Sequence, residues 1–352
     1  MRAVAEVRCN ELLVDTGTPA NEVRLLRLAK KAGKQIMTLI NEEIKPSDIM
    51  TKESFENAIR VVLAVGGSTN ACIHIPAISQ ELKIDLELDI WNRMSKETPF
   101  ICSVYPNHST YTMRDLDRAG GIQAVMKELA PLLRLDVLTV TGKTLKENLE
   151  NVEILDHDVI RPLTNLYSKE GGIVILKGNL APNGAVVKQS AVSPEMLRHR
   201  GPAKVFDSEE EATDALMKGK IKPKDVVVIR YEGTKGSPGC NEMLNIMHCI
   251  VGMGLDKSVA LVTDGRFSGT NKGGAVGHVS PEAADGGPIA VVQDGDIIGI
   301  DVPNRKLNIG ISEEELMDRL SKWKRREPRV KKGVLNFYAK FGGPLEKGAR
   351  IF

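Results

Sequence analysis

The sequence predicts an α/β protein whose helix-rich first part is followed by a second part built mainly of short strands. Apolar residues recur at three- and four-residue spacing through about the first 150 positions, whereas β-branched runs separated by glycine follow from about Leu163. Glycine accounts for 32 of 352 residues, about 9% against a usual ~7%, which indicates many tight turns. With only 7 Phe, 2 Trp and 5 Tyr, the core must be mainly aliphatic.

The first part is expected to contain at least five helices. Four stretches place their apolar residues on one side of a helix. They are residues 21–44, 51–65, 73–82 and 121–133. Thr144 and Glu147 have the spacing of a capping box, which predicts the start of a further helix.

The second part is expected to form a β-barrel or β-sandwich flanked by helices, rather than a doubly wound sheet. Capping boxes that begin at Ser208 and Ser312 predict two helices between the strands. The Asp294-Gly295 dipeptide predicts a hairpin between two of the apolar runs. These runs are residues 171–178, 184–192, 225–233, 258–265, 288–302 and 306–311. We therefore expect two domains, over residues 1–160 and 161–352.

Composition excludes several classes of protein. The net charge is +2, which favours neither a nucleic-acid partner nor an acidic tail. No stretch reaches the ~18 apolar residues that a membrane span needs, and the first residues lack the pattern of a signal or transit peptide. The cysteines are odd in number and include no CxxC pair, so we expect reduced thiols in a cytoplasmic protein. They are Cys9, Cys72, Cys102, Cys240 and Cys249.

The densest candidate segment, residues 263–287, contains seven glycines and follows a predicted buried strand. Ligand-binding loops gather at the carboxyl ends of strands, and glycine lets backbone N–H groups approach an anion closely. Ser268 lies between Phe267 and Gly269, with Thr270 two residues on. The segment fits neither the nucleophile elbow nor the P-loop pattern. A long structural loop with ordinary hydroxyl groups remains the alternative.

A second candidate segment, residues 231–243, also follows a predicted strand. Glu242 is expected in the first turn of a helix that runs towards Met253. It is either a ligand of a hard metal ion or a carboxylate stabilised by the helix dipole.

Three weaker patterns have structural explanations. Ser68, Thr69 and Asn70 would each be a good N-cap for the following helix, and they could equally contact a substrate. The six histidines show no HxxxH or HxH spacing, so a histidine zinc site has little support. The basic run 322–332 is expected to be a solvated helix face rather than a phosphate or nucleic-acid contact.

Eight ordered motifs resemble the dihydroxy-acid dehydratase / 6-phosphogluconate dehydratase family across nearly the whole chain. They are VGGSTN (65–70), DLDRAGG (115–121), YSKEGG (167–172), LKGNLAPNGAVVK (176–188), GPAKVF (201–206), VVIRYEGTKGSPG (227–239), LVTDGRFSG (261–269) and GHVSPEAADGGPIA (277–290). The chain is most similar to the dihydroxy-acid dehydratases, with the sugar-acid dehydratases next. The resemblance implies that the second part is the family's swivelling β-barrel domain.

The resemblance also implies roles for individual residues. Glu242 matches the family's glutamate ligand of magnesium, and Ser268 matches the serine whose alkoxide removes the C2 proton. Thr270 and Gly269 match positions beside the substrate. The cysteine ligands of the family's iron–sulfur cluster ([2Fe–2S] or [4Fe–4S]) lie in motifs upstream of Met1, so no cluster ligand is identified in this chain. Cys240 stands where an apolar residue is common and is not assigned to the cluster.

The implied function is that of a hydro-lyase, which converts a 2,3-dihydroxy carboxylic acid to a 2-keto acid in branched-chain amino-acid biosynthesis. The chain is expected to be incomplete for catalysis and to form a homodimer or to associate with a missing N-terminal half. Neither a nucleic acid nor a membrane is expected as a partner. The alternatives are an aldonate or 6-phosphogluconate dehydratase, and a non-catalytic truncated paralogue that acts as a binding module.

Overall fold

The computed structural model describes residues 22–105, 107, 110–267 and 272–351, which form two compact units. The chain passes from the first unit to the second mainly between Gly172 and Ile173. Two short segments, Cys72–Ala77 and Glu87–Asp89, also belong to the second unit.

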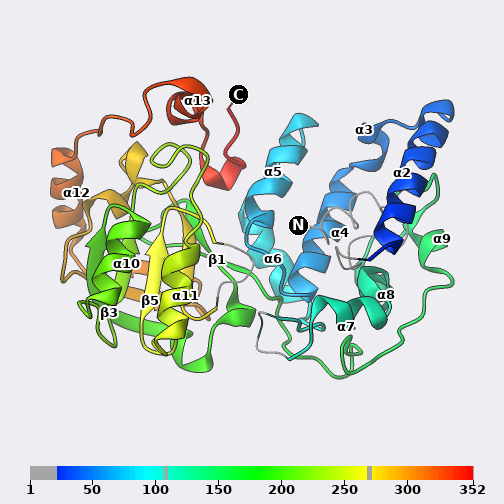
Figure 1. Ribbon diagram of the computed structural model, residues 1–352, viewed down its shortest axis with the longest axis horizontal. Coiled ribbons are helices and arrows are strands. Elements are labelled where there is room, and N and C mark those ends of the chain that lie inside the picture. The colour runs from blue at the N-terminus through cyan, green and yellow to red at the C-terminus, as the bar shows by residue number, and fades with distance from the viewer. Residues whose placement is uncertain (1–21, 106, 108–109, 268–271, 352) are drawn as a thin grey trace. The chain divides into compact units, whose positions relative to one another are not determined.

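The first unit is helical (Figure 1). Its central helix, α4 (Lys52–Ala64), begins where the Thr51 side chain accepts the N–H of Ser54, and most of its residues are buried. The expected capping box opens α9 (Leu145–Leu149), since Thr144 accepts the N–H of Glu147. The other helices that begin or lie in this part of the chain are α2 (Arg24–Asn41), α3 (Pro46–Ile49), α5 (Ala71–Glu81), α6 (Asp89–Glu97), α7 (Met113–Arg118) and α8 (Gly121–Glu128). The four predicted helices are thereby confirmed, although α8 ends at Glu128, before the expected end at Leu133.

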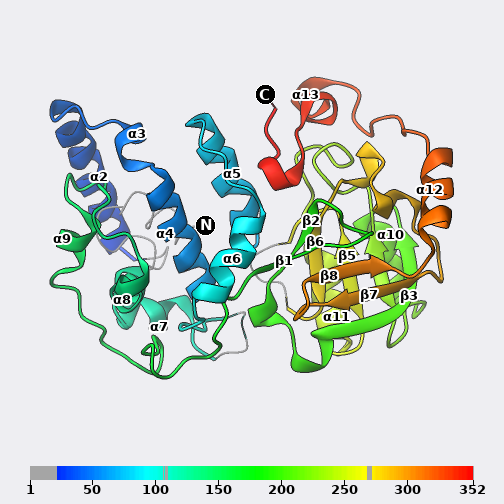
Figure 2. The same cartoon turned by 180° about the vertical axis from the view of Figure 1, so that it is seen from behind.

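The second unit is built on one eight-stranded sheet in the order β1-β2-β6-β5-β4-β3-β7-β8. The sheet nearly closes into a barrel, because Lys177, next to β1, pairs with Lys306 on β8 (Figure 2). The strands are β1 (Val174–Leu176), β2 (Gly184–Val187), β3 (Arg198–Phe206), β4 (Val226–Ile229), β5 (Ala260–Thr263), β6 (Ala275–Ser280), β7 (Ile297–Asp301) and β8 (Lys306–Ile309). The barrel-like fold with flanking helices is therefore as predicted.

Four neighbouring strands, β3, β4, β5 and β6, run parallel in the centre of this sheet. Helix α10 (Glu209–Met217) connects β3 to β4, and α11 (Leu244–Gly252) connects β4 to β5. Along β4 the side chains alternate: Val226 and Val228 point into the barrel core, whereas Val227 and Ile229 pack with the two helices. The chain continues through α12 (Glu313–Lys322) and α13 (Gly333–Phe341). Ser208 and Ser312 cap α10 and α12 as predicted.

The predicted hairpin at Asp294-Gly295 is wrong. Residues Pro288–Val291 form a 3-10 turn instead of a strand, because proline has no N–H to give a ladder and its fixed φ suits the start of a helical turn. Gly295 and Asp294 bond instead to β3, through the Ala203 carbonyl and the Val205 N–H. The glycine-rich segment 263–287 is also not one long loop, because it contains strand β6.

Two strand glycines test the packing of this sheet. A Cβ atom at Gly201 on β3 would lie 1.7 Å from the Lys224 carbonyl oxygen, whereas one at Gly299 on β7 would have its nearest neighbour at 4.0 Å. We predict that Gly201→Ala lowers the free energy of unfolding by about 3 kcal/mol or more, because backbone must move. Gly299→Ala should change it by less than about 1 kcal/mol. Equal effects in urea denaturation would contradict this packing.

Candidate functional site

An acidic residue follows each of the four parallel strands. Asp207 comes after β3, Glu232 after β4, Asp264 after β5 and Glu282 after β6. Parallel strands bring their carboxyl ends to one edge of a sheet, which is where ligands bind in open α/β folds. Glu232, Asp264 and Glu282 are all buried. These three carboxylates, together with the buried Glu209, are called the edge carboxylates below.

Asp264 joins two loops at this edge. Its carboxylate accepts the N–H groups of Tyr231 (3.1 Å) and Glu232 (2.9 Å) from one loop and of Ala283 (2.8 Å) from another. Burial raises the pKa of Asp264 to about 6, although the three hydrogen bonds favour the charged form. The side chain therefore holds in place two loops that have no ladder of their own.

Glu282 holds the tip of the loop after β4. It accepts the N–H of Lys235 (2.9 Å) and that of Gly236 (3.2 Å). Burial and then the nearby charge of Asp264 raise the pKa of Glu282 to about 7. A Cβ atom at position 233 would lie 2.1 Å from the Glu282 carboxylate, so this close approach requires Gly233.

Glu209 and Glu232 secure the segment that carries Glu242. The Glu209 carboxylate accepts the N–H groups of Asn245 (2.7 Å) and Ile246 (3.1 Å), which begin α11. Glu232 in turn accepts the N–H of Glu209 (3.2 Å) and a guanidinium N–H of Arg329 (3.3 Å). Its second oxygen has no hydrogen-bond partner in the described part of the chain.

Glu242 lies just before α11 rather than in its first turn, which corrects the expected position. Because the Glu209 carboxylate already accepts the first N–H groups of α11, the helix dipole does not explain why a carboxylate stands at position 242. Instead, Glu242 pairs through its backbone with Arg266 in an isolated bridge, and its Oε1 lies 2.6 Å from the Arg266 Nη1. The Glu242 side chain is 34% exposed, which leaves a carboxylate edge open to a ligand.

Ser268, Gly269 and Thr270 lie outside the described residues, so their roles stay predictions. The segment before them is anchored by Phe267, which is buried among the side chains that cover α10 and α11. After them, Gly273 donates its N–H to the Ala191 carbonyl (3.0 Å). The described residues on either side of them are thus fixed on the second unit.

Two buried residues of the second unit, His278 and Lys188, are absent from the candidate sites predicted from the sequence. His278 on β6 has a φ of 54°, and burial and then the charge of Arg266 lower its pKa to about 3. Lys188 follows β2, whose Val187 pairs with Val276. Burial lowers the pKa of Lys188 to about 8. An amine with such a pKa can exchange protons near neutral pH.

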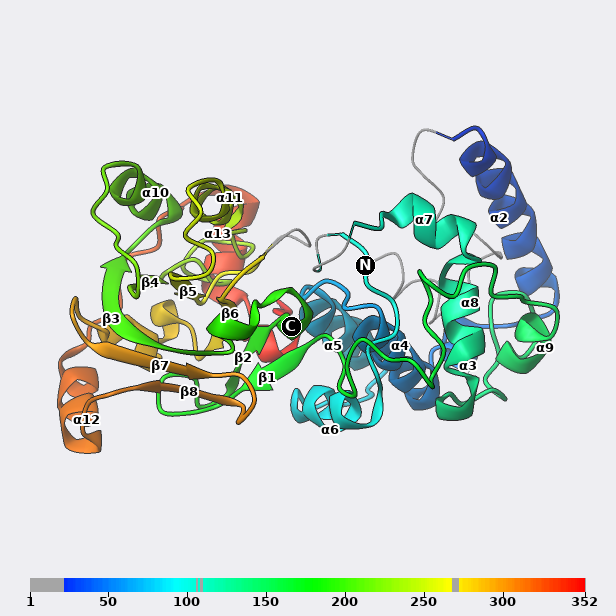
Figure 3. The ribbon, with the colours of Figure 1, turned by 90° about the horizontal axis from the view of Figure 1, so that it is seen from below.

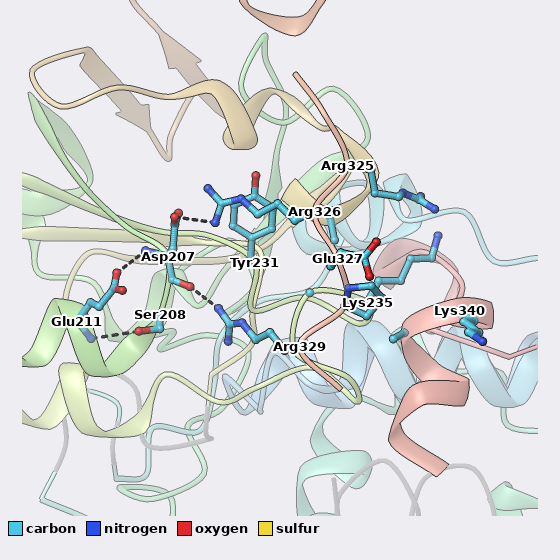
Figure 4. Close-up of a pocket in the computed structure, with 14 residues that line it drawn as sticks. Asp207, Ser208, Glu211, Tyr231, Lys235, Arg325, Arg326, Glu327, Arg329 and Lys340 are labelled. Carbon is cyan, nitrogen blue, oxygen red and sulfur yellow. Dashed lines mark hydrogen bonds and ion pairs between the residues drawn. The ribbon is translucent and has the colours of Figure 1, made fainter. Parts of the chain in front are cut away.

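A cavity of about 510 Å³ opens at the same edge (Figure 4). Its charged lining combines Lys235, Arg325, Arg326, Arg329 and Lys340 with Asp207, Glu211 and Glu327. The arginines come from the basic run 322–332, which is not the solvated helix face that was expected, because α12 ends at Lys322. Arg326 pairs with Asp207 (2.7 Å) and Arg325 with Asp285 (3.0 Å). The run therefore neutralises carboxylates at this edge.

The comparison with known proteins decides the family. The family model described as dihydroxy-acid/6-phosphogluconate dehydratase N-terminal matches residues 1–148, and the corresponding C-terminal model matches residues 158–349. The chain belongs to the dihydroxy-acid/6-phosphogluconate dehydratase family.

Curated relatives in this dehydratase family agree. The chain is 53% identical to a dihydroxy-acid dehydratase of Acetivibrio thermocellus over 99% of its own length and 63% of that protein. It is 52% identical to one of Halothermothrix orenii, with the same two coverages. A third, of Caldanaerobacter subterraneus, is 54% identical over 94% of the chain and 60% of the relative. The chain thus spans less than two thirds of the length of these dehydratases.

Three of the described cysteines, Cys72, Cys102 and Cys240, are buried. Burial raises the pKa of the Cys72 and Cys240 thiols, and that of the Cys102 thiol to about 12. Within the described ranges, no three His, Cys, Asp or Glu residues are placed to hold a metal ion. No described helix is both long and apolar enough to span a membrane.

The raised pKa of Glu282 predicts a pH-dependent stability. The folded state keeps a proton that the unfolded state loses at a pH of about 4.5, so between about 4.5 and 7 the free energy of unfolding falls as pH rises. The lowered pKa of His278 makes the free energy of unfolding rise with pH below pH 6.5. The contribution of Glu282 is therefore measured as the difference in free energy of unfolding between the wild type and a variant.

We predict that the difference in free energy of unfolding between the wild type and Glu282→Gln changes by roughly 2–3 kcal/mol between pH 5 and 8. The exposed Glu314→Gln is the matched control and should give a flat difference. Urea denaturation at several pH values measures both. A flat difference for Glu282→Gln would contradict the buried, protonated state.

Lys188 gives a second prediction. Since burial disfavours the charged form of its amine, Lys188→Met should raise the free energy of unfolding at pH 7 by roughly 1–3 kcal/mol, with the gain shrinking between pH 8 and 10.5. Lys306→Met, at an exposed position on β8, should change it by less than about 0.5 kcal/mol. A loss of stability on Lys188→Met would mean that the ammonium group has a stabilising partner.

Proposed function

We propose that this chain is the larger part of a hydro-lyase that converts a 2,3-dihydroxy carboxylic acid to a 2-keto acid. The observation that carries the proposal is the half-open Glu242 carboxylate beside Arg266, on a segment fixed by the edge carboxylates. The relatives' name supports a dihydroxy acid as the substrate class. The branched-chain amino-acid pathway and a cytoplasmic location are part of the proposal.

The chemistry requires a base at C2. Ser268 takes the C2 proton, the electrons of that bond form the C2=C3 double bond, and the C3 hydroxyl leaves with a proton as water. The resulting enol then becomes the 2-keto acid. Because a serine hydroxyl is normally protonated at neutral pH, nearby positive charge must favour its alkoxide. Arg266 supplies such a charge two residues before it, and Gly269 and Thr270 contact the substrate.

Glu242 fits the role of one magnesium ligand. It is an oxygen donor with an open edge, and Mg²⁺ is usually held by one or two carboxylates together with water and substrate oxygens. Bound there, the ion would supply positive charge to the substrate carboxylate. We assign the other protein ligands of the magnesium ion, and the cysteines of an iron–sulfur cluster, to the part of the longer relatives that the match with this chain does not cover. The assembled enzyme is proposed to be a homodimer.

The second candidate function is that of a non-catalytic paralogue that acts as a binding module. The name of the matching family also includes 6-phosphogluconate dehydratase, so sugar acids belong among the substrates tested.

A chimera separates these possibilities. In it, these 352 residues replace the matching part of the Acetivibrio thermocellus dihydroxy-acid dehydratase. We predict turnover of 2,3-dihydroxy-3-methylbutanoate by the chimera, and loss of turnover by about 10²-fold or more on Ser268→Ala, since proton abstraction then lacks its base. Glu242→Gln, which keeps an acceptor for Arg266, should raise the magnesium concentration needed for half-maximal activity.

Ser321→Ala and Glu314→Gln on α12 are matched controls. They should leave unchanged both the turnover and the magnesium concentration needed for half-maximal activity. A chimera that folds and binds metal but turns over no dihydroxy or sugar acid would favour the binding module. Near-normal turnover after Ser268→Ala would remove that residue from the role of base.

A further inference from the structure

The basic run that follows α12 passes over the carboxyl edge of the parallel strands. Figure 3 shows α12 on the opposite side of the sheet from α10 and α11, and residues 323–332 lead from it to α13. Along this path the Trp323 Nε1 lies 3.3 Å from the Tyr231 hydroxyl oxygen, and the Arg326 guanidinium carbon lies 4.0 Å from the centre of the Tyr231 ring. These contacts hold the run against the loop that follows β4. Both segments line the cavity of about 510 Å³ described above.

The cations at this cavity come from three separate segments of the second unit (Figure 4). One segment is the loop after β4, the second is the basic run, and the third is α13. The cations are Lys235 from the first, Arg325, Arg326 and Arg329 from the second, and Lys340 from the third. Segments that are far apart in the sequence therefore bring positive charge to one hollow.

The lining of the cavity carries more positive than negative charge. Five cations face three carboxylates, which leaves an excess of two positive charges. The ion-pair partners that lie outside the lining do not change this excess, because two of them are cations and two are carboxylates. They are Arg230, Lys331, Asp285 and Glu232. The cavity is therefore suited to an anion.

Two carboxylates at this cavity are each shared by two cations. Asp285 pairs with Lys235 (2.7 Å) and with Arg325 (3.0 Å). Asp207 pairs with Arg326 (2.7 Å) and with a second arginine that lies outside the lining (2.6 Å). Because one carboxylate neutralises one cation, each sharing leaves a positive charge beside the cavity.

The two arginines in these shared pairs are accessible to a ligand. The Arg325 side chain is 67% exposed and that of Arg326 is 50% exposed. A guanidinium group has five N–H donors, and each of the two ion pairs uses one of them. The planar fork of such a group matches two oxygen atoms of a phosphate or a carboxylate.

Charge, volume and donor geometry together select the chemical class of the ligand. An excess of two positive charges matches a dianion, and the volume lies in the range of cavities that bind small molecules. The lining also includes apolar surface that suits a short carbon skeleton, from Tyr231, Ala284, Pro328 and Ala339. We propose that this cavity binds a small organic dianion, either a phosphate monoester or a dicarboxylate.

This anion site is separate from the candidate magnesium site. Neither Glu242 nor Arg266 is among the residues that line the cavity. The reaction described under the proposed function uses no residue of this lining. The inference therefore goes beyond the proposed function and holds for a catalytic and for a non-catalytic chain.

Isothermal titration calorimetry of the whole chain tests the proposal. Glycerol 3-phosphate is the phosphate monoester, succinate is the dicarboxylate, and glycerol is the neutral control. The titrations are run in EDTA at pH 8, where a phosphate monoester carries close to two negative charges because its second pKa is about 6. We expect at least one dianion to bind at one site per chain with a Kd below about 1 mM, and glycerol not to bind. The tighter of the two dianions identifies the source of the negative charge.

Charge variants locate the binding site. Arg326→Gln and Lys340→Gln each remove one cation from the lining, and each should weaken binding of the dianion by about 10-fold. Lys218→Gln removes an equally exposed charge at the far end of α10 and is the matched control, with a Kd within about 2-fold of the wild type. Lys340 is exposed on α13, so its variant keeps the test valid if Arg326→Gln impairs folding.

Four outcomes would overturn the inference. Absence of binding by both dianions would show that the cavity is not an anion site. Binding that neither Arg326→Gln nor Lys340→Gln weakens would place the ligand elsewhere on the chain. Equal weakening by Lys218→Gln would mean attraction to the overall charge rather than to this cavity. Binding that appears only when magnesium replaces EDTA would assign the ligand to the candidate magnesium site.

Discussion

The loops at the carboxyl edge of the parallel strands depend on buried carboxylates for their hydrogen bonds. Loop backbone N–H groups need acceptors when they are buried, and no sheet ladder supplies them here. Asp264 accepts three such groups, and Glu282 and Glu209 accept two each. The segment that carries Glu242 lies between these anchors, so the position of the candidate metal ligand depends on residues whose carboxylates accept backbone N–H groups.

Burying several carboxylates near one another costs free energy, and other residues of the second unit reduce that cost. Burial, and then the nearby charge of other carboxylates, disfavours the charged form, as the raised pKa values of Asp264 and Glu282 indicate. The basic run after α12 offsets part of that cost, because Arg329 pairs with the fully buried Glu232. A chain segment that looks like a solvated tail in the sequence is therefore part of the site's electrostatic balance.

Much of the fold followed from local patterns, whereas the organisation of the site did not. Helical spacing predicted α2, α4, α5 and α8, and β-branched runs predicted most strands, because both signals are contained in a few consecutive residues. The strand predicted at 288–292 does not form, because Pro288 begins a 3-10 turn in an otherwise strand-like sequence. The edge carboxylates are each isolated in the sequence, and only the parallel pairing of β3 to β6 brings them together. Spacing likewise predicted α2, but not that the side chains of Leu26, Ile36 and Ile40 would be exposed.

Amide hydrogen exchange of the whole chain at pH 7 tests the central claim most directly. If the edge carboxylates hold the loops, the N–H groups of Tyr231, Glu232, Lys235, Gly236 and Ala283 should exchange as slowly as those in β4 and β5, although none of them belongs to an α-helix or a strand. Exchange at the rate of freely exposed loop amides would contradict the account, because the carboxylates would then not be the acceptors that order this edge.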